Sequence, residues 1–294
     1  MHGSPGRTRT AVCAVALAML TACSGGGGQL AERDGSTAST TAAPNAPVRT
    51  SVLEIPRSAA AVTRELREVE TGLRGDDRDP GHLSALGRRQ DLAYRALAAH
   101  PAWVERVVTA LPAPVQTAVR ANVKAGASLA ELTAGGTPPA TLPDWQVLAP
   151  RAASTLRGYY EEAQAATGTP WEYLAAIHLV ESRMGRIHGT SNAGAQGPMQ
   201  FIPATWEAYG AGDITDDHDA IKAAARYLAD RGAPGDMRRA LFSYNNDDRY
   251  VAAIELYAQV MRADPRAYDG YHAWQVFFGT GHGTFLLPEG YGTP

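Results

Sequence analysis

The stretch "PWEYLAAIHLVESRMG", residues 170–185, places one carboxylate in what otherwise has the pattern of a buried helix. Leu174, Ile177 and Glu181 recur at intervals of three and four residues, so they share one face of that helix. The apolar neighbours identify this face as the one turned to the core. We therefore expect Glu181 to point into the protein rather than into water.

The ends of this helix also have sequence signals. Thr169, Pro170 and Glu172 are typical of a helix start, with Thr169 as the N-cap residue and Glu172 closing a capping box. Gly185 is typical of a helix end. Glu181 is then expected near the last turn, beside carbonyl groups that form the negative end of the helix dipole.

Burial and the helix dipole both favour the protonated form of Glu181. A carboxylic acid that keeps its proton near neutral pH is suited to act as a general acid in glycoside cleavage. The structural alternatives are an ion pair with Arg183 or Arg186, or a side chain turned to solvent. His178 lies three residues earlier and either orients the acid or is an interior histidine with its own partners.

The N-terminus has the pattern of an export signal. A positively charged start precedes the apolar run "AVCAVALAML" (11–20), which is shorter than the roughly 20 residues of a membrane span. The residues before Cys23 resemble a bacterial lipobox, which implies a signal peptide over 1–22 and lipid on the Cys23 thiol. The expected location is extracytoplasmic, with the protein anchored to the membrane as a lipoprotein. An ordinary signal peptide with an incidental cysteine is the alternative.

Composition narrows the classes of partner. The other cysteine, Cys13, leaves with the signal, so no intrachain disulfide and no cysteine-based zinc site is expected. The formal net charge of −3 makes nucleic acid a poor partner. We expect no cofactor and no metal. Four aspartates within 213–219 lack the closing glutamate of a calcium loop, and helix capping by Asp216 or Asp217 explains them better.

The chain divides into four expected parts. After the signal, residues 23–57 are rich in Gly, Ser, Thr, Ala and Pro and predict a flexible, lipid-anchored linker. Residues 58–142 have helical periodicity and predict a small helical domain in which we find no chemistry. Residues 143–294 contain 20 of the 22 aromatic residues. Because aromatic rings can form the walls of a sugar cleft, this region is where we expect glycan binding, with Tyr271, Trp274 and Tyr291 as candidate walls.

Three short motifs then occur in order: "ES" at 181–182, "SNAGAQGPMQ" at 191–200 and "YNND" at 244–247. Together they resemble the signatures of bacterial lytic transglycosylases of the SLT or lytic transglycosylase B-like group, which cleave murein and have a lysozyme-like catalytic domain. The resemblance is strong over about 148–257. It implies a mainly α fold, with a lysozyme-like α-rich catalytic domain preceded by the small helical segment.

The resemblance also implies roles for individual residues. Glu181 would be the catalytic acid, and the hydroxyl of Tyr244 would approach it. Ser243 stands where the family usually has alanine. The glycine-bracketed loop would let a polymer lie close to the backbone. The residues expected to contact substrate are Ser191, Met199, Gln200, Tyr244 and Asn245, with Ser182 and His178 supporting them.

The implied reaction uses one carboxyl group. Glu181 protonates the oxygen between N-acetylmuramic acid (MurNAc) and N-acetylglucosamine (GlcNAc), and the C6 hydroxyl then closes a 1,6-anhydro ring on MurNAc. The expected partners are peptidoglycan strands and the membrane, and the expected state is a monomer. A hydrolytic muramidase, or a non-catalytic lipoprotein that binds peptidoglycan, remains an alternative. Catalysis requires that Glu181 be shielded from bulk solvent and still be reached by a groove.

Overall fold

The structure, a computed structural model, describes residues 45–293. The expected signal peptide, Cys23 and most of the expected linker lie outside these residues. Within residues 45–293 no helix combines the length and the hydropathy that a membrane span needs. The described part is mainly helical, as expected, with two small antiparallel sheets.

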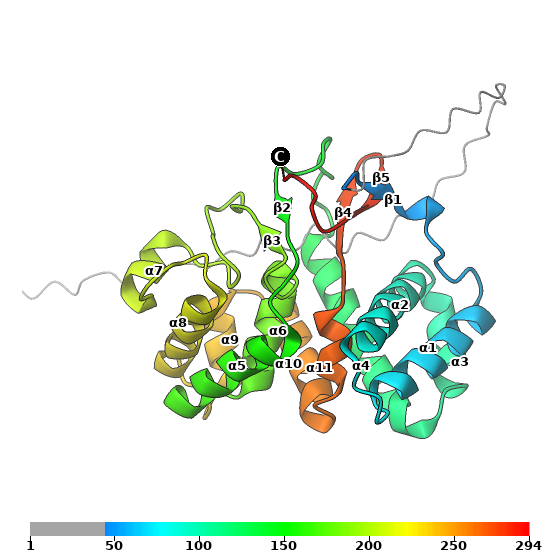
Figure 1. The fold of residues 1–294 in the computed structure, drawn as a ribbon, viewed down its shortest axis with the longest axis horizontal. Helices are drawn as coiled ribbons and strands as arrows, with labels where there is room; N and C mark the ends of the chain where they lie inside the picture. The colour runs from blue at the N-terminus through cyan, green and yellow to red at the C-terminus, as the bar shows by residue number, and fades with distance from the viewer. Residues whose placement is uncertain (1–44, 294) are drawn as a thin grey trace, which may run out of the picture.

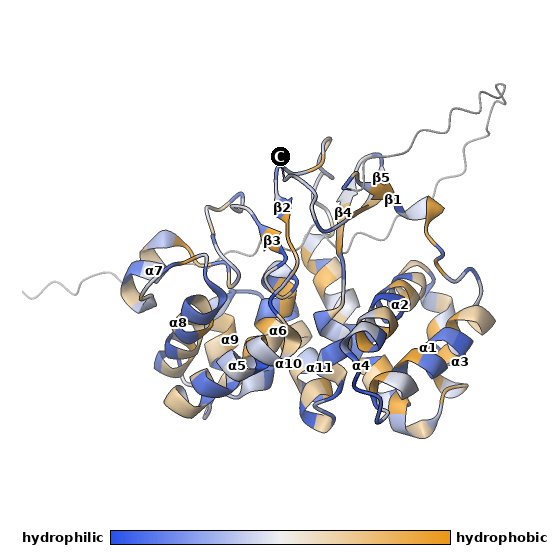
Figure 2. Ribbon diagram, viewed as in Figure 1, coloured by the Kyte–Doolittle hydropathy of each residue, from blue (hydrophilic) through white to orange (hydrophobic). Residues whose placement is uncertain are grey.

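The first four helices form one group, seen at the right of Figure 1. They are α1 (Ala59–Leu73), α2 (Pro80–Ala99), α3 (Val104–Thr109) and α4 (Ala113–Thr133). In α1 the apolar residues at helical spacing, Val62, Leu66, Val69 and Leu73, are fully buried. The residues between them are mostly exposed or half-buried, so hydrophilic and hydrophobic residues alternate along the helix in Figure 2. Ser58 caps α1 by accepting a hydrogen bond from the backbone N–H of Ala61.

The second group of helices surrounds α6 (Trp171–Ser182). Eleven of its twelve residues are buried, which is expected of a helix that is enclosed on all sides. Helices α5, α8, α10 and α11 pack against it. The bounds of the other helices are α5 Ala153–Thr167, α7 Pro203–Tyr209, α8 Asp217–Asp230, α9 Met237–Tyr244, α10 Asp248–Ala263 and α11 Ala267–His272.

The strands lie on one side of the helical layer in Figure 1. One sheet has the order β1 (Val48–Arg49), β5 (Gly283–Leu287) and β4 (Val276–Thr280), so a segment from the expected linker pairs with the C-terminal hairpin. The other sheet pairs β2 (Gln146–Val147) with β3 (Ile187–His188). A small hydrophobic cluster joins the two sheets, formed by Trp145, Val147, Ile187, Val276, Phe278 and Leu287.

A single hydrophobic core runs through both groups of helices. Helix α4 packs along α10, and α2 packs against α11. The approach of α2 to α11 is close enough that a Cβ at Gly87 would lie 2.6 Å from the carbonyl oxygen of Gly270. The segment expected as a small helical domain is therefore in direct contact with the helices that surround α6.

A buried polar network also crosses this contact. Glu70 on α1 is fully buried, forms an ion pair with Arg74, and accepts hydrogen bonds from Gln90 and Tyr94 on α2. Asn122 on α4 donates to Tyr94, at 2.8 Å, and accepts from Tyr271 on α11. Every member of the network has a partner, which is the condition under which buried polar groups do not destabilise a core.

Candidate active site

The start of α6 differs from the sequence-based expectation. Thr169 is not the N-cap residue: it is fully buried and its hydroxyl donates to the carbonyl of Ala225. Pro170 occupies the cap position, and the amide oxygen of Gln164 accepts from the first helical N–H, that of Trp171, at 2.7 Å. Glu172 pairs with Arg262 at 2.6 Å instead of closing a capping box. The predicted capping box is therefore wrong, because tertiary contacts take both of its side chains.

The end of α6 places Glu181 inside the protein. Its side chain is 3% exposed, in agreement with the expectation from Leu174 and Ile177. Its Oε1 accepts a hydrogen bond of 2.7 Å from the hydroxyl of Tyr250, and its Oε2 is buried with no partner among residues 45–293. Burial raises the pKa of Glu181 to about 8, although the hydrogen bond from Tyr250 lowers it. The group is therefore a carboxylic acid at neutral pH.

The structural alternatives for Glu181 do not occur. Arg183 adopts a left-handed conformation with φ of 55° and directs its guanidinium to the carbonyl of Leu179 and the ring of Trp274. Arg186 donates to the carbonyl of His272 at 2.7 Å and lies 3.4 Å from Glu289. Neither arginine pairs with Glu181.

Two tyrosines lie near the acid, and their roles differ from the expectation. Tyr244, at the end of α9, donates to the carbonyl of Met199 at 2.5 Å. Burial, and next the nearby charge of ionised Glu181, raise the pKa of Tyr244 well above the usual value. The direct partner of Glu181 is Tyr250, in the first turn of α10. Tyr250 was not among the residues expected at the site, and the only sequence signal for it is its position six residues after Tyr244.

The loop of residues 191–200 is held by its own polar groups. The hydroxyl of Ser191 accepts from the backbone N–H groups of Ala193 and Ala195, so it shapes the loop. Gln200 has φ of 51°, and its amide donates to the carbonyl of Gly197 at 2.9 Å while its Oε1 is buried without a partner in the described chain. Gly197 has φ of 72°, and a Cβ there would lie 1.9 Å from the carbonyl oxygen of Ile214.

Ser182 joins this loop to the helix that carries Glu181. Its hydroxyl donates to the carbonyl of Pro198 at 2.6 Å and accepts from the N–H of Gly185 at 3.0 Å. Ser182 therefore ties the Pro198 segment of the loop to the residue next to the acid.

The remaining expected substrate contacts are covered by protein. The side chain of Met199 is fully buried in the hydrophobic core, so it does not offer an open surface for a sugar ring, and its carbonyl serves Tyr244 instead. Asn245 ends α9 and is 8% exposed. Tyr271 and Trp274 are also core residues, bonded to Asn122 and Gln90, which contradicts their expectation as sugar walls.

His178 is an interior histidine with its own partners. One ring nitrogen is 2.7 Å from the hydroxyl of Tyr160, and the other is 3.3 Å from a carboxylate oxygen of Asp217. Burial alone would raise the pKa of Asp217, but contacts with His178 and Arg151 lower it below its usual range. Asp216 caps α8, as one of the two expected residues. The described residues contain no group of three or more His, Cys, Asp or Glu side chains able to hold a metal ion.

Two cavities lie near the ends of α6. One of about 150 Å³ is lined by the loop that follows α6, including Gly185, Gly197, Pro198 and Asp217. The other, of about 520 Å³, lies at the start of α6. Glu181 lines neither of these two cavities. Of the two conditions for catalysis, shielding from solvent is met, whereas neither of these two cavities supplies a groove to Oε2.

Comparison with known proteins points to one family. Residues 158–259 match the family model described as "Transglycosylase SLT domain". The chain is 30% identical over 127 residues to a protein of Thiobacillus denitrificans named Membrane-bound lytic murein transglycosylase F, covering 40% of this chain and 27% of that protein. It is 32% identical over 115 residues to Membrane-bound lytic murein transglycosylase F 2 of Alkalilimnicola ehrlichii, covering 36% and 25%. The chain thus spans about a quarter of the length of these relatives. No solved structure matches it.

Proposed function

We propose that this protein cleaves peptidoglycan without hydrolysis, because residues 158–259 match the transglycosylase SLT domain model. The bond is the β-1,4 linkage from MurNAc to GlcNAc, and the product is a 1,6-anhydro-MurNAc end. The observation that supports this most is Glu181. Within the matched domain it is a carboxylic acid that burial keeps protonated, with one hydroxyl partner.

We assign the transferred proton to Oε2 of Glu181. Because Tyr250 donates to Oε1, that oxygen is held in place and Oε2 is left to carry the proton. Oε2 donates its proton to the glycosidic oxygen as the bond from that oxygen to C1 of MurNAc breaks, and GlcNAc leaves with a free 4-hydroxyl. The neighbouring acetamido oxygen of MurNAc stabilises C1.

The second step returns the acid to its first state. Glu181, now ionised, takes the proton of the MurNAc C6 hydroxyl as that oxygen bonds to C1. The attacking group belongs to the same sugar, so its proximity replaces a bound water. A pKa of about 8 suits both steps, since the group must release a proton and regain it near neutral pH. Substrate entry requires the protein around Oε2 to open, as in many enzymes that close over their substrate.

Product analysis tests this function against its rivals. Purified murein is digested with the protein, and the fragments are examined by mass spectrometry. Anhydro ends support the proposal, whereas reducing MurNAc ends would identify a hydrolytic muramidase. Absence of any cleavage, with murein retained on the protein in a pull-down, would identify a non-catalytic binding protein.

The cell-envelope setting is a proposal of the same kind. The named relatives are membrane-bound murein transglycosylases, and "LTAC" at 20–23 supports lipid on Cys23. Metabolic labelling with a palmitate analogue tests it. The label should be lost in Cys23→Ser, and label retained in that variant would contradict the assignment.

A further inference from the structure

The cavity at the start of α6 has the features of a binding site, although it lies away from the acid. Its wall is formed by the last turns of α5, the connecting loop and the first residues of α6: Glu161, Gln164, Ala165, Gly168, Pro170, Trp171 and Glu172. Its volume of about 520 Å³ is within the range of small-molecule pockets. Ten residues of helix separate Trp171 from Glu181, which corresponds to about 15 Å along the axis.

The cavity presents two hydrogen-bond donors without partners. Trp171 is 8% exposed, and no group among residues 45–293 accepts from its indole N–H. The amide oxygen of Gln164 is engaged by the N–H of Trp171, which orients the side chain and leaves the amide N–H₂ free to donate. Neither donor atom is among the fully buried polar atoms of the described residues, so both donors are open to the cavity, where a ligand can accept from them in place of water.

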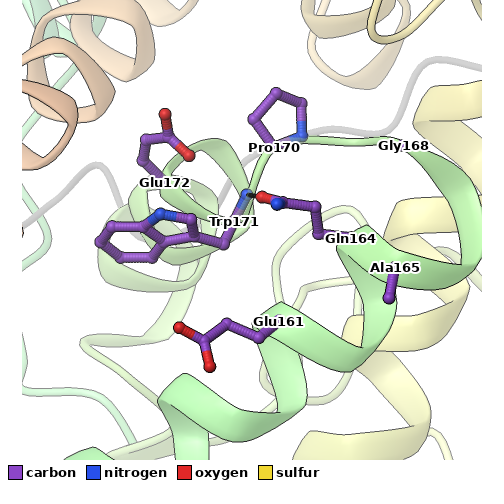
Figure 3. A pocket seen from close by; sticks show the side chains of 7 residues that line it. All are labelled: Glu161, Gln164, Ala165, Gly168, Pro170, Trp171 and Glu172. Carbon is purple, nitrogen blue, oxygen red and sulfur yellow. Dashed lines mark hydrogen bonds between the residues drawn. The ribbon is translucent and has the colours of Figure 1, made fainter.

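Two acceptors complete the wall. Glu161 uses Oε1 to pair with Arg157 at 2.7 Å, and Glu172 uses Oε1 to pair with Arg262 at 2.6 Å. In each carboxylate Oε2 has no partner in the described residues. Figure 3 shows the indole of Trp171 lying between these two carboxylates, with the amide of Gln164 beside the start of α6. Both carboxylates are already neutralised by arginine, so the site favours an uncharged ligand over a cation.

We propose that this cavity is a second saccharide-binding site, distinct from the cleavage site, that takes a neutral N-acetylated amino sugar. The hydroxyls of the sugar would donate to the free carboxylate oxygens, and its acetamido carbonyl would accept from Gln164 and Trp171. The apolar atoms of Ala165, Pro170 and the indole edge would cover the C–H groups of the ring. The amino-sugar class rests on the proposed function, because murein supplies such sugars.

The site would hold a strand that is not being cut. Since the cavity is at the opposite end of α6 from Glu181, a glycan bound there does not occupy the acid. The same polymer, or a neighbouring strand, could then stay attached while the protein moves from one cleaved bond to the next.

Binding is tested with the soluble β-1,4-linked tetramer of N-acetylglucosamine. The full chain carries Glu181→Gln to prevent cleavage, and the indole N–H resonance of Trp171, identified by its loss in Trp171→Phe, reports on the cavity. The tetramer should shift this resonance with saturation. Cellotetraose, which lacks the acetamido group, should bind at least about fivefold more weakly at this resonance.

A substitution at Gln164 tests whether its N–H₂ group donates to the bound saccharide. Gln164→Glu keeps the acceptor for the N–H of Trp171 and removes the N–H₂ donor, so binding of the tetramer should weaken by about fivefold. Glu162→Gln, a neighbour on α5 that pairs with His218 and Lys222 outside the cavity, is the matched control and should leave the dissociation constant unchanged. An indole resonance that the tetramer does not move would overturn the inference, as would tighter binding in Gln164→Glu or equal binding of cellotetraose.

The outcome is independent of the cleavage assay. A saturable shift at Trp171 in a protein that releases no anhydro ends would support this site and refute the proposed function. If the protein releases anhydro ends but its Trp171 resonance does not shift, the proposed function is supported and this second site is refuted.

Discussion

Glu70 and Glu181 are both buried glutamates on helices, but their surroundings are opposite. Glu70 is 0% exposed and has an arginine, an amide and a tyrosine hydroxyl around it. Glu181 is 3% exposed and has a single tyrosine hydroxyl, with one oxygen left without a partner among residues 45–293. Burial is therefore not what marks a reactive carboxyl. The mark is burial without the partners that would stabilise the charged form.

The largest expected effect is on catalysis. Glu181→Gln retains the shape and the acceptor for Tyr250 but can neither donate nor regain a proton. We expect release of anhydro ends from murein to fall by about 10³-fold or more. Glu207→Gln, an exposed glutamate on α7, is the control and should cleave at the wild-type rate. Substantial cleavage by Glu181→Gln would remove Glu181 from the mechanism.

The same substitution at Glu70 should act on stability. Glu70→Gln removes the nearer of the two carboxylates that pair with Arg74 and leaves Asp264 at 3.6 Å, so we expect the free energy of unfolding to fall by roughly 1–2 kcal/mol in urea denaturation. An unchanged midpoint would mean that the network of Glu70 contributes no net stability.

At Glu181 the sign of the stability change should reverse. The folded pKa of about 8 lies above the usual value of 4.5, so between these values the folded state binds more protons than the unfolded state. Stability is then lost as the pH rises from 4.5 toward 8. Glu181→Gln removes this loss, and we expect it to be more stable than the wild type by roughly 1–3 kcal/mol at pH 7 and about equal at pH 4.5. A destabilised variant at pH 7 would contradict the raised pKa.

The smallest effect is expected from the partner of the acid. The hydrogen bond from Tyr250 lowers the pKa of Glu181, so Tyr250→Phe should raise it further. The descending alkaline limb of kcat/KM, near pH 8 in the wild type, should move up by about one unit. A limb that stays in place would show that Tyr250 does not tune the acid.

The sequence predicted the elements better than it predicted the contacts. The buried face of α1 and the burial of Glu181 follow from the spacing of apolar residues along one helix, and this spacing can be read from the sequence of that helix alone. The capping box at Thr169 failed because the carbonyl of Ala225 on α8 takes the Thr169 hydroxyl and Arg262 on α10 takes the carboxylate of Glu172. Tyr250 was missed for a related reason. Which of the two tyrosines reaches the carboxyl group of Glu181 depends on how α9 and α10 are oriented relative to α6, and a short sequence motif does not determine that orientation.

The network around Glu70 was also outside the reach of sequence analysis. Its members come from α1, α2, α4 and α11. Nothing in the sequence around any one of them distinguishes it from a polar residue at the surface. The same holds for the cavity at Trp171, whose donors are recognised as unpartnered once the surrounding side chains are placed.

Because α4 packs along α10, the segment that matches the family model is shorter than the unit that folds around one hydrophobic core. A truncated protein beginning at residue 143 would keep every motif, yet it would leave one flank of α10 bare to water, and α10 is the helix that presents Tyr250 to Glu181. We expect such a truncated protein to be less stable and prone to aggregation, and its Glu181 to lose the fixed orientation that Tyr250 provides.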